Sequence, residues 1–255
     1  MSQLVEWELI LDCNYNCKYC GLLDNKIKPH KEYKEFIKTL NKNYPTIEIF
    51  VFGGEPFLHQ NIDIIIGEFL KIKQPFIIQT NLSNYSTKKI IKIDKKYNIN
   101  ISIHPDECSI KDIINNIQNI INIVNIKNVS LMYVGKKSLK YYNEISKVID
   151  IELTPITDIG CEGYGNILKE FIELKNNKIY NKIYKFENNI INLNGYNIAR
   201  SELWDKQNDK KFTTLNKECF YKDRYVLFDP QLNKYNCCYR KNNDGYCLND
   251  KCFFM

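Results

Sequence analysis

The sequence lacks the features that would place the protein in a membrane or outside the cell. Its first residues, Met1-Ser2-Gln3, lead directly into an apolar strand pattern, without the basic start and apolar core of a secretory signal. No apolar run approaches the roughly 20 residues that a helix needs to cross a bilayer. We therefore expect a cytoplasmic protein with no membrane partner.

The sequence also has little concentrated charge. The formal net charge is +6, and the lysines are scattered over expected helix faces instead of forming one basic tract. Nucleic-acid binding usually requires a basic stripe or patch, so this charge supports a nucleic-acid partner only weakly. Solvated helix surfaces are the better interpretation. There is no internal repeat beyond the strand and helix alternation described below.

Cysteine, in contrast, is plentiful, with ten residues gathered mainly near the two ends of the chain. The cytoplasm keeps thiols reduced, so clustered cysteines there favour metal centres over a disulfide framework. Cys108 and Cys161 stand apart from both groups. We interpret Cys108 as structural, and Cys161 as a loop cysteine with hydrogen donor or ligand as the alternatives.

Strand patterns and helical spacing alternate from Leu4 to Ile156. The expected strands are 4–11, 46–52, 75–80, 100–104, 128–134 and 149–156. The expected helices are 30–44, 62–73, 86–97, 109–124 and 138–148. Residues 109–124 repeat isoleucine so often that a strand also fits, but their length and the start signals Ser109 and Asp112 favour a helix. Such alternation predicts an α/β fold with a parallel sheet that curls into a barrel or an open, partial barrel.

Three thiols, Cys13, Cys17 and Cys20, lie within eight residues directly after the first strand. A loop of this kind can turn all three toward one metal centre. Structural zinc normally takes four protein ligands, whereas three cysteines leave a coordination position open, which suits an iron–sulfur cluster. A structural zinc knuckle is the alternative.

The spacing CxxxCxxC, with Tyr19 just before the third cysteine, resembles the motif of the radical S-adenosylmethionine (SAM) superfamily. The resemblance implies a [4Fe-4S] cluster on Cys13, Cys17 and Cys20 with an open iron site that binds SAM. It also implies reductive cleavage of SAM to a 5′-deoxyadenosyl radical, an electron donor of the flavodoxin or ferredoxin type, and a partial (β/α)6 TIM barrel over roughly residues 4–156.

Gly53-Gly54-Glu55-Pro56 resembles the GGEP motif of the same superfamily and follows the second expected strand. Its glycines would let the backbone approach a ligand closely, and the carbonyl and carboxylate groups around Glu55 could accept hydrogen bonds from the SAM ammonium. A plain turn is the alternative. By position, further SAM contacts are expected from Tyr19, Thr80, Asn81, Ser102 and His104. Of these, Tyr19 would lie near the adenine, and His104 could contact SAM or substrate or be structural.

After the barrel the pattern changes, and we expect three regions. Residues 1–158 form the barrel, 159–218 a linker with a helix (166–176) and a hairpin (189–199), and 219–255 a cysteine-rich segment. The hairpin is predicted from Asn194-Gly195 between apolar residues.

Five cysteines lie in the last segment, and residues 225–237 are typical of a hairpin leading into a cysteine. This resembles the twitch and SPASM extensions of radical SAM enzymes, which implies one auxiliary [4Fe-4S] cluster. A left-handed Asn233 would make Cys238 the ligand, whereas a left-handed Leu232 would make it Cys237, which we favour. A four-cysteine zinc site is the alternative. The expected metal ligands of this segment are Cys219, Cys237 or Cys238, Cys247 and Cys252.

The extensions of this type often accompany peptide maturation, so the resemblance implies hydrogen abstraction from a peptide, as in a peptide maturase or dehydrogenase. The alternatives are modification of a small molecule such as a nucleoside or carbohydrate, modification of a nucleic acid, or a zinc-binding interaction protein without enzymatic activity.

Overall fold

The computed structural model describes residues 4–20, 32–155, 165–185, 190–193, 196–199 and 225–235. In the described part of residues 4–155, six strands alternate with five α-helices. These elements are β1 (Leu4–Ile10), α1 (Tyr33–Asn43), β2 (Ile49–Gly53), α2 (Ile62–Lys71), β3 (Phe76–Thr80), α3 (Asn84–Ile93), β4 (Asn98–Ile103), α4 (Ile110–Ile120), β5 (Asn125–Tyr133), α5 (Lys137–Ile145) and β6 (Glu152–Pro155). Each expected strand and helix of this part is confirmed, with ends that differ by a few residues.

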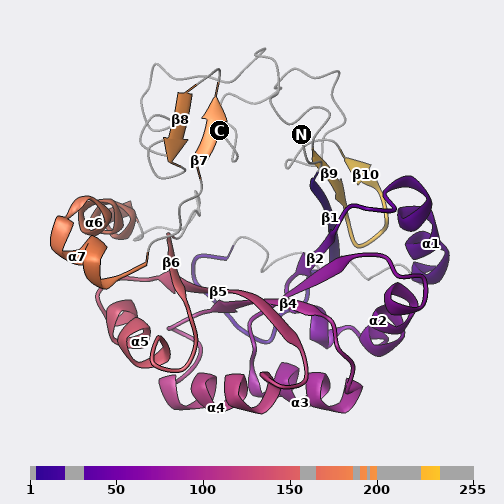
Figure 1. Ribbon diagram of the computed structural model, residues 1–255, viewed down its shortest axis with the longest axis horizontal. Helices are drawn as coiled ribbons and strands as arrows, with labels where there is room; N and C mark the ends of the chain where they lie inside the picture. Colours follow the sequence, from indigo (N-terminus) through magenta and orange to yellow (C-terminus); the bar gives the residue numbers. More distant parts are fainter. Residues whose placement is uncertain are drawn as a thin grey trace.

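These six strands form one sheet with two later strands, β9 (Tyr225–Phe228) and β10 (Lys234–Tyr235), in the order β10-β9-β1-β2-β3-β4-β5-β6. Every pair from β1 to β6 is parallel, and the helices α1 to α5 lie around the outside of the curved sheet (Figure 1). The two edge strands are β6 and β10, so the sheet is open. The predicted partial barrel is therefore confirmed, and the carboxyl ends of its parallel strands lie along one rim, where α/β folds place their sites.

The isoleucine-rich segment 109–124 is helical, as its start signals predicted. Ser109 is the N-cap of α4, because its Oγ accepts a hydrogen bond of 3.1 Å from the Asp112 amide. The isoleucines at helical spacing, Ile113, Ile117 and Ile120, are fully buried. Burial of this stripe, which lies on one face of a helix, favours the helix over the strand that the same residues could form.

Aromatic packing fixes β1, which carries the cysteine loop. The Trp7 side chain is buried, and its ring meets the rings of Phe36 from α1 and Phe69 from α2 edge-on, at centroid distances of 5.0 and 6.2 Å. Such edge-to-face contacts add to the free energy gained from apolar burial. The strand that leads into the cysteine loop is thus held firmly by its neighbouring helices.

The hairpin predicted before Cys237 is present as β9 (Tyr225–Phe228) and β10 (Lys234–Tyr235). Sequence patterns did not reveal where it lies: β9 pairs in parallel with β1, so the hairpin extends the barrel sheet (Figure 1). Asp229 holds the turn by accepting hydrogen bonds from the amides of Gln231 and Asn233, both at 2.9 Å. The region boundaries at 158 and 218 remain predictions.

Between β6 and β9 lie α6 (Gly165–Asn176), α7 (Lys178–Ile183), β7 (Ile190–Leu193) and β8 (Tyr196–Ala199). The pairing of β7 and β8 is antiparallel, which confirms the predicted hairpin, whereas the short helix α7 was not expected. Asn177 caps α7 by accepting a hydrogen bond from the Ile179 amide. Among the described residues, no helix is both long enough and apolar enough to cross a membrane.

Candidate cluster and cofactor site

The cysteine loop follows β1 at the rim of the sheet. Cys17 and Tyr19 are buried and pack with Met132 and Val134 from the end of β5, while Cys13 is exposed and Cys20 is half-buried. A turn closes the loop, because the Cys20 amide donates a hydrogen bond of 2.9 Å to the Cys17 carbonyl. The loop is therefore held against the end of β5 instead of projecting freely.

The end of β2 is joined directly to the start of this loop. The Gly54 amide donates to the Ile10 carbonyl at 2.7 Å, and the Glu55 amide donates to the Asp12 carbonyl at 2.8 Å. A Cβ on Gly53 would lie 2.0 Å from the Ile10 oxygen, and one on Gly54 would lie 2.2 Å from the Asp12 oxygen. In this structure, then, the two glycines allow a close approach between two strand ends, where the sequence suggested an approach to a ligand.

Glu55 turns its carboxylate into the protein, where it is fully buried. One oxygen, Oε1, accepts hydrogen bonds from the Phe57 amide at 3.1 Å and from the Thr80 hydroxyl at 2.9 Å. The other, Oε2, accepts from the Asn81 amide at 2.8 Å. Burial raises the pKa of this carboxyl to about 7, although these hydrogen bonds oppose the rise.

This orientation changes what can be expected of the Gly53–Pro56 segment. The Glu55 carboxylate ties the end of β2 to the end of β3, so main-chain carbonyls are left as the acceptors proposed for a SAM ammonium. Pro56 is buried and begins the short 3-10 helix η1 (Pro56–Leu58). Thr80 is also used internally, since its hydroxyl oxygen accepts from the Leu82 amide at 3.1 Å.

Asn81 reaches from the end of β3 to the cysteine loop. Its Nδ2 donates to Asn14 Oδ1 at 2.9 Å and points to Cys13 Sγ at 3.7 Å, while its Oδ1 accepts from the Ser83 amide at 3.0 Å. The amide side chain is thereby held at both ends. It positions the part of the loop that bears the first thiol.

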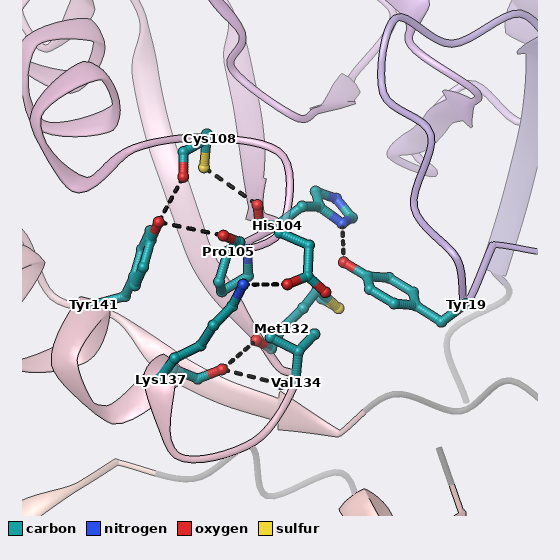
Figure 2. Close-up of polar contacts among 10 residues, drawn as sticks. Tyr19, His104, Pro105, Cys108, Met132, Val134, Lys137 and Tyr141 are labelled. Atoms are coloured by element: carbon teal, nitrogen blue, oxygen red, sulfur yellow. Dashed lines mark hydrogen bonds and ion pairs between the residues drawn. The ribbon is translucent and has the colours of Figure 1, made fainter. Parts of the chain in front are cut away.

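His104, just after β4, also faces the loop (Figure 2). Its Nδ1 lies 2.7 Å from the Tyr19 hydroxyl oxygen. The same nitrogen lies 3.5 Å from Cys17 Sγ, and Nε2 lies 3.0 Å from Ser102 Oγ. The rings of Tyr19 and His104 are stacked, with centroids 5.9 Å apart. Burial lowers the pKa of His104 to about 4, so the imidazole is neutral at physiological pH.

Several residues at this site were missed by the sequence analysis. Glu107 accepts a hydrogen bond of 3.2 Å from the Asn16 amide, and Met132 and Val134 pack against the loop. Their positions after β4 and at the end of β5 were the available signal, because parallel strands end at one rim. Tyr141 on α5 supports the segment after β4 through the Cys108 carbonyl, and no local pattern points to it.

The thiols fit an iron–sulfur cluster in donor type. In the described ranges, no three His, Cys, Asp or Glu side chains are grouped as a site for a single metal ion. Burial is the largest effect that raises the pKa values of the Cys13 and Cys17 thiols, and the nearby Cys20 thiol adds to the rise in both. A four-iron cluster bonds each cysteine to a different iron, so it requires thiols spread around it and not converging on one point.

The remaining predicted ligands lie outside the described residues. They are Cys219, Cys237, Cys238, Cys247 and Cys252, and Cys161 lies outside them as well. The choice between Cys237 and Cys238 was predicted to depend on which turn residue is left-handed. Leu232 is left-handed, with a φ of +67°, and Asn233 is not. That is the arrangement for which Cys237 is the predicted ligand.

The fold and site together define an open parallel α/β barrel with a three-thiol loop at the carboxyl end of its first strand. Residues 7–135 match the family model described as the Radical SAM superfamily, and the chain belongs to that superfamily. Its members are iron–sulfur enzymes that use SAM, so the expected class of enzyme is confirmed, and a [4Fe-4S] cluster and SAM are the cofactors that membership implies.

Among curated proteins, the chain is similar to a "Putative glycyl-radical enzyme activating enzyme" of Methanocaldococcus jannaschii, at 26% identity over 162 residues. The match covers 59% of this chain and 56% of the relative, so the chain spans little more than half of that protein.

Two solved structures share the fold at low identity. SuiB of Streptococcus suis bound to S-adenosylmethionine has a TM-score of 0.56 at 13% identity, covering 93% of this chain and 58% of SuiB. The enzyme anSMEcpe with bound AdoMet and a Cp18Cys peptide has a TM-score of 0.54 at 14% identity, covering 97% of this chain and 76% of that one.

Proposed function

We propose that the protein cleaves SAM reductively at a [4Fe-4S] cluster held by Cys13, Cys17 and Cys20, and that the reaction abstracts hydrogen from a peptide. When bound, the cluster supplies one electron to the sulfonium of SAM, which breaks the sulfur–C5′ bond and yields methionine and a 5′-deoxyadenosyl radical. A flavodoxin or ferredoxin-type protein is the proposed electron donor.

The observation that carries this proposal is the way four strand ends meet the cysteine loop. Main-chain hydrogen bonds join the loop to the end of β2, Asn81 joins it to β3, and His104 joins it to β4. Residues at the end of β5 cover Cys17 and Tyr19 with apolar surface. Such a preorganised loop can hold three thiolates around a cluster while one face stays open to SAM.

A peptide substrate is supported by what the similar folds are described as binding. The anSMEcpe structure contains a peptide together with AdoMet, and this chain covers most of that protein. Fold similarity at this identity supports the general architecture only, so the substrate class is part of the proposal.

A second candidate is activation of another enzyme, which the description of the M. jannaschii relative favours. In that case the hydrogen would come from the polypeptide of a folded partner protein instead of a short peptide. Incubation with candidate partners, followed by electron paramagnetic resonance (EPR) of the partner chain, separates the two, since only activation leaves a stable protein radical there.

The proposal includes an auxiliary cluster on Cys219, Cys237, Cys247 and Cys252. The left-handed Leu232 supports Cys237 over Cys238 as the ligand. The attachment of β9 to β1 supports a location near the barrel, because the hairpin that precedes Cys237 is part of the same sheet.

Anaerobic reconstitution followed by a SAM cleavage assay tests the central claim. Wild-type protein with dithionite should form 5′-deoxyadenosine, and Cys17→Ala should not. Cys108→Ser is the matched control: its thiol is half-buried and is not a proposed ligand, and a serine hydroxyl can still donate to the His104 carbonyl. Continued cleavage by Cys17→Ala would remove the proposal.

A further inference from the structure

We propose that Ser102, His104 and Tyr19 form a hydrogen-bond chain that ends on the sulfur of Cys17 and sets the reduction potential of the cluster. This inference rests on the proposed function, because it concerns the cluster that Cys17 would help to hold. It assigns the three side chains a role as positioning residues for the cluster, in place of the direct SAM contacts that the sequence suggested.

The distances define the chain. Ser102 Oγ lies 3.0 Å from His104 Nε2, and His104 Nδ1 lies 2.7 Å from the Tyr19 hydroxyl. Tyr19 packs against Cys17, and its hydroxyl lowers the pKa of the Cys17 thiol through a side-chain hydrogen bond. The Sγ of Cys17 is also 3.5 Å from His104 Nδ1. All four groups are buried or half-buried, so water does not compete freely for these bonds.

The donors and acceptors can be assigned once Cys17 ligates iron. A ligating thiolate has no hydrogen and can only accept, so the Tyr19 O–H must donate to it. The Tyr19 oxygen then accepts from His104 Nδ1–H, and Nε2 accepts from the Ser102 O–H. Every hydrogen is used once, and the imidazole stays neutral.

Helix α5 holds the histidine end of this chain in place (Figure 2). Tyr141 donates to the Cys108 carbonyl at 2.6 Å and to the Pro105 carbonyl at 3.2 Å, and Lys137 forms an ion pair with Asp106. The Cys108 thiol closes the segment by donating to the His104 carbonyl at 3.3 Å. Residues 104–108 are therefore fixed from outside the barrel, which preorganises the imidazole toward the cysteine loop.

A hydrogen bond to a cluster sulfur stabilises the more negative, reduced state of the cluster more than the oxidised state. Removing the bond should therefore shift the reduction potential to more negative values. A residue that only packs against the loop would alter iron content or stability without this shift.

The test is spectroelectrochemical titration of the reconstituted full chain without SAM, followed by EPR. Tyr19→Phe removes only the last donor, and His104→Leu removes the middle of the chain; both should shift the potential negatively. The double variant should shift it little further than Tyr19→Phe alone. His104 acts through the Tyr19 hydroxyl, so His104→Leu, which leaves that donor in place, should give the smaller shift. His104→Asn should restore part of the wild-type potential, because its Nδ2 can donate from near the position of Nδ1.

Tyr15→Phe is the matched control. Tyr15 lies on the same loop with its ring edge-on to His104 at 6.0 Å, but its hydroxyl is not part of the chain. It should keep the wild-type potential. If Tyr19→Phe and His104→Leu do not hold the cluster, His104→Asn decides the matter: a small negative shift of its potential supports the positioning role, and an unchanged potential contradicts it.

An unchanged potential in Tyr19→Phe and His104→Leu with full iron content would overturn the inference, and so would equal shifts in Tyr15→Phe. Its failure is separable from failure of the proposed function. If the wild-type protein assembles the cluster and cleaves SAM, but the reduction potential does not depend on these residues, only the hydrogen-bond chain is contradicted. Absence of a cluster in the wild type contradicts the proposed function itself.

Discussion

The Asn81 amide donates a hydrogen bond of 2.8 Å to the buried Glu55 carboxylate, and through it the ends of β2 and β3 are locked together. The side chain of the same asparagine then reaches Asn14 in the cysteine loop. One residue thus connects a buried acid to the thiol-bearing loop. The geometry makes the protonation state of Glu55 important for the stability of the whole rim.

Stability should fall as Glu55 ionises. Its pKa rises from 4.5 to about 7 on folding, so the folded chain holds a proton that the unfolded chain has already released between these values. The free energy of unfolding should therefore decrease as pH rises from about 4.5 to about 7, by about 3 kcal/mol in total.

Urea unfolding of the cluster-free protein across this pH range measures the effect. Glu55→Gln cannot titrate at this position. The difference in the free energy of unfolding by which it is less stable than wild type should therefore shrink as pH rises through the same range. Glu35→Gln, at an exposed position of α1, is the control and should follow the wild-type profile. If the free energy of unfolding depended on pH in the same way in wild type and Glu55→Gln, the prediction would be contradicted.

Thr80→Val should destabilise the protein by about 1–3 kcal/mol, because it removes a hydrogen bond to a buried carboxylate and leaves the Leu82 amide without its acceptor. The matched change Thr39→Val affects an exposed hydroxyl that donates only to the Glu35 carbonyl, and it should alter stability by less than about 0.5 kcal/mol. Chemical denaturation of the two variants gives both values. Equal losses of stability would show that the buried hydrogen bonds of Thr80 contribute no more than the exposed one of Thr39.

Gly54→Ala should cost about 3 kcal/mol or more and reduce iron uptake, because the new Cβ would collide with the Asp12 carbonyl at the start of the cysteine loop. Gly67→Ala in α2 is the control, since its Cβ would meet only the flexible end of Lys95 at 3.4 Å. That change should stabilise the protein by about 0.5–1 kcal/mol. Thermal unfolding and iron analysis of both variants check the pair.

The carboxyl-terminal cysteines should bind iron independently of the first loop. A variant with Cys13, Cys17 and Cys20 all replaced by alanine should still contain about four irons per chain if the auxiliary cluster exists. Conversely, a variant lacking Cys247 and Cys252 should still cleave SAM but fail to make product. Mössbauer spectroscopy decides the first point, and one zinc without iron would reassign the segment as a structural zinc site.

Local sequence patterns determined much of this protein. Four features depend on residues that are close together in the chain. They are the alternation of apolar strands and amphipathic helices, the Ser109 cap, the hairpin predicted from Asn194-Gly195, and the position of the three thiols after β1. Such patterns are read directly, because the period of burial and the chemistry of caps and turns are local properties. The rim location of the site followed from the parallel topology.

The tertiary structure decided which groups meet at that rim. Tyr19 and His104 are 85 positions apart, Glu55 and Asn81 are 26 apart, and the side of the sheet joined by β9 depends on a pairing across the whole chain. The sequence indicated that Glu55 and His104 would lie near a cofactor, but not that one turns inward and the other faces a thiol. The direction of a side chain at a strand end depends on the residues that distant segments bring next to it. The spacing of apolar residues within one segment does not indicate which residues those are.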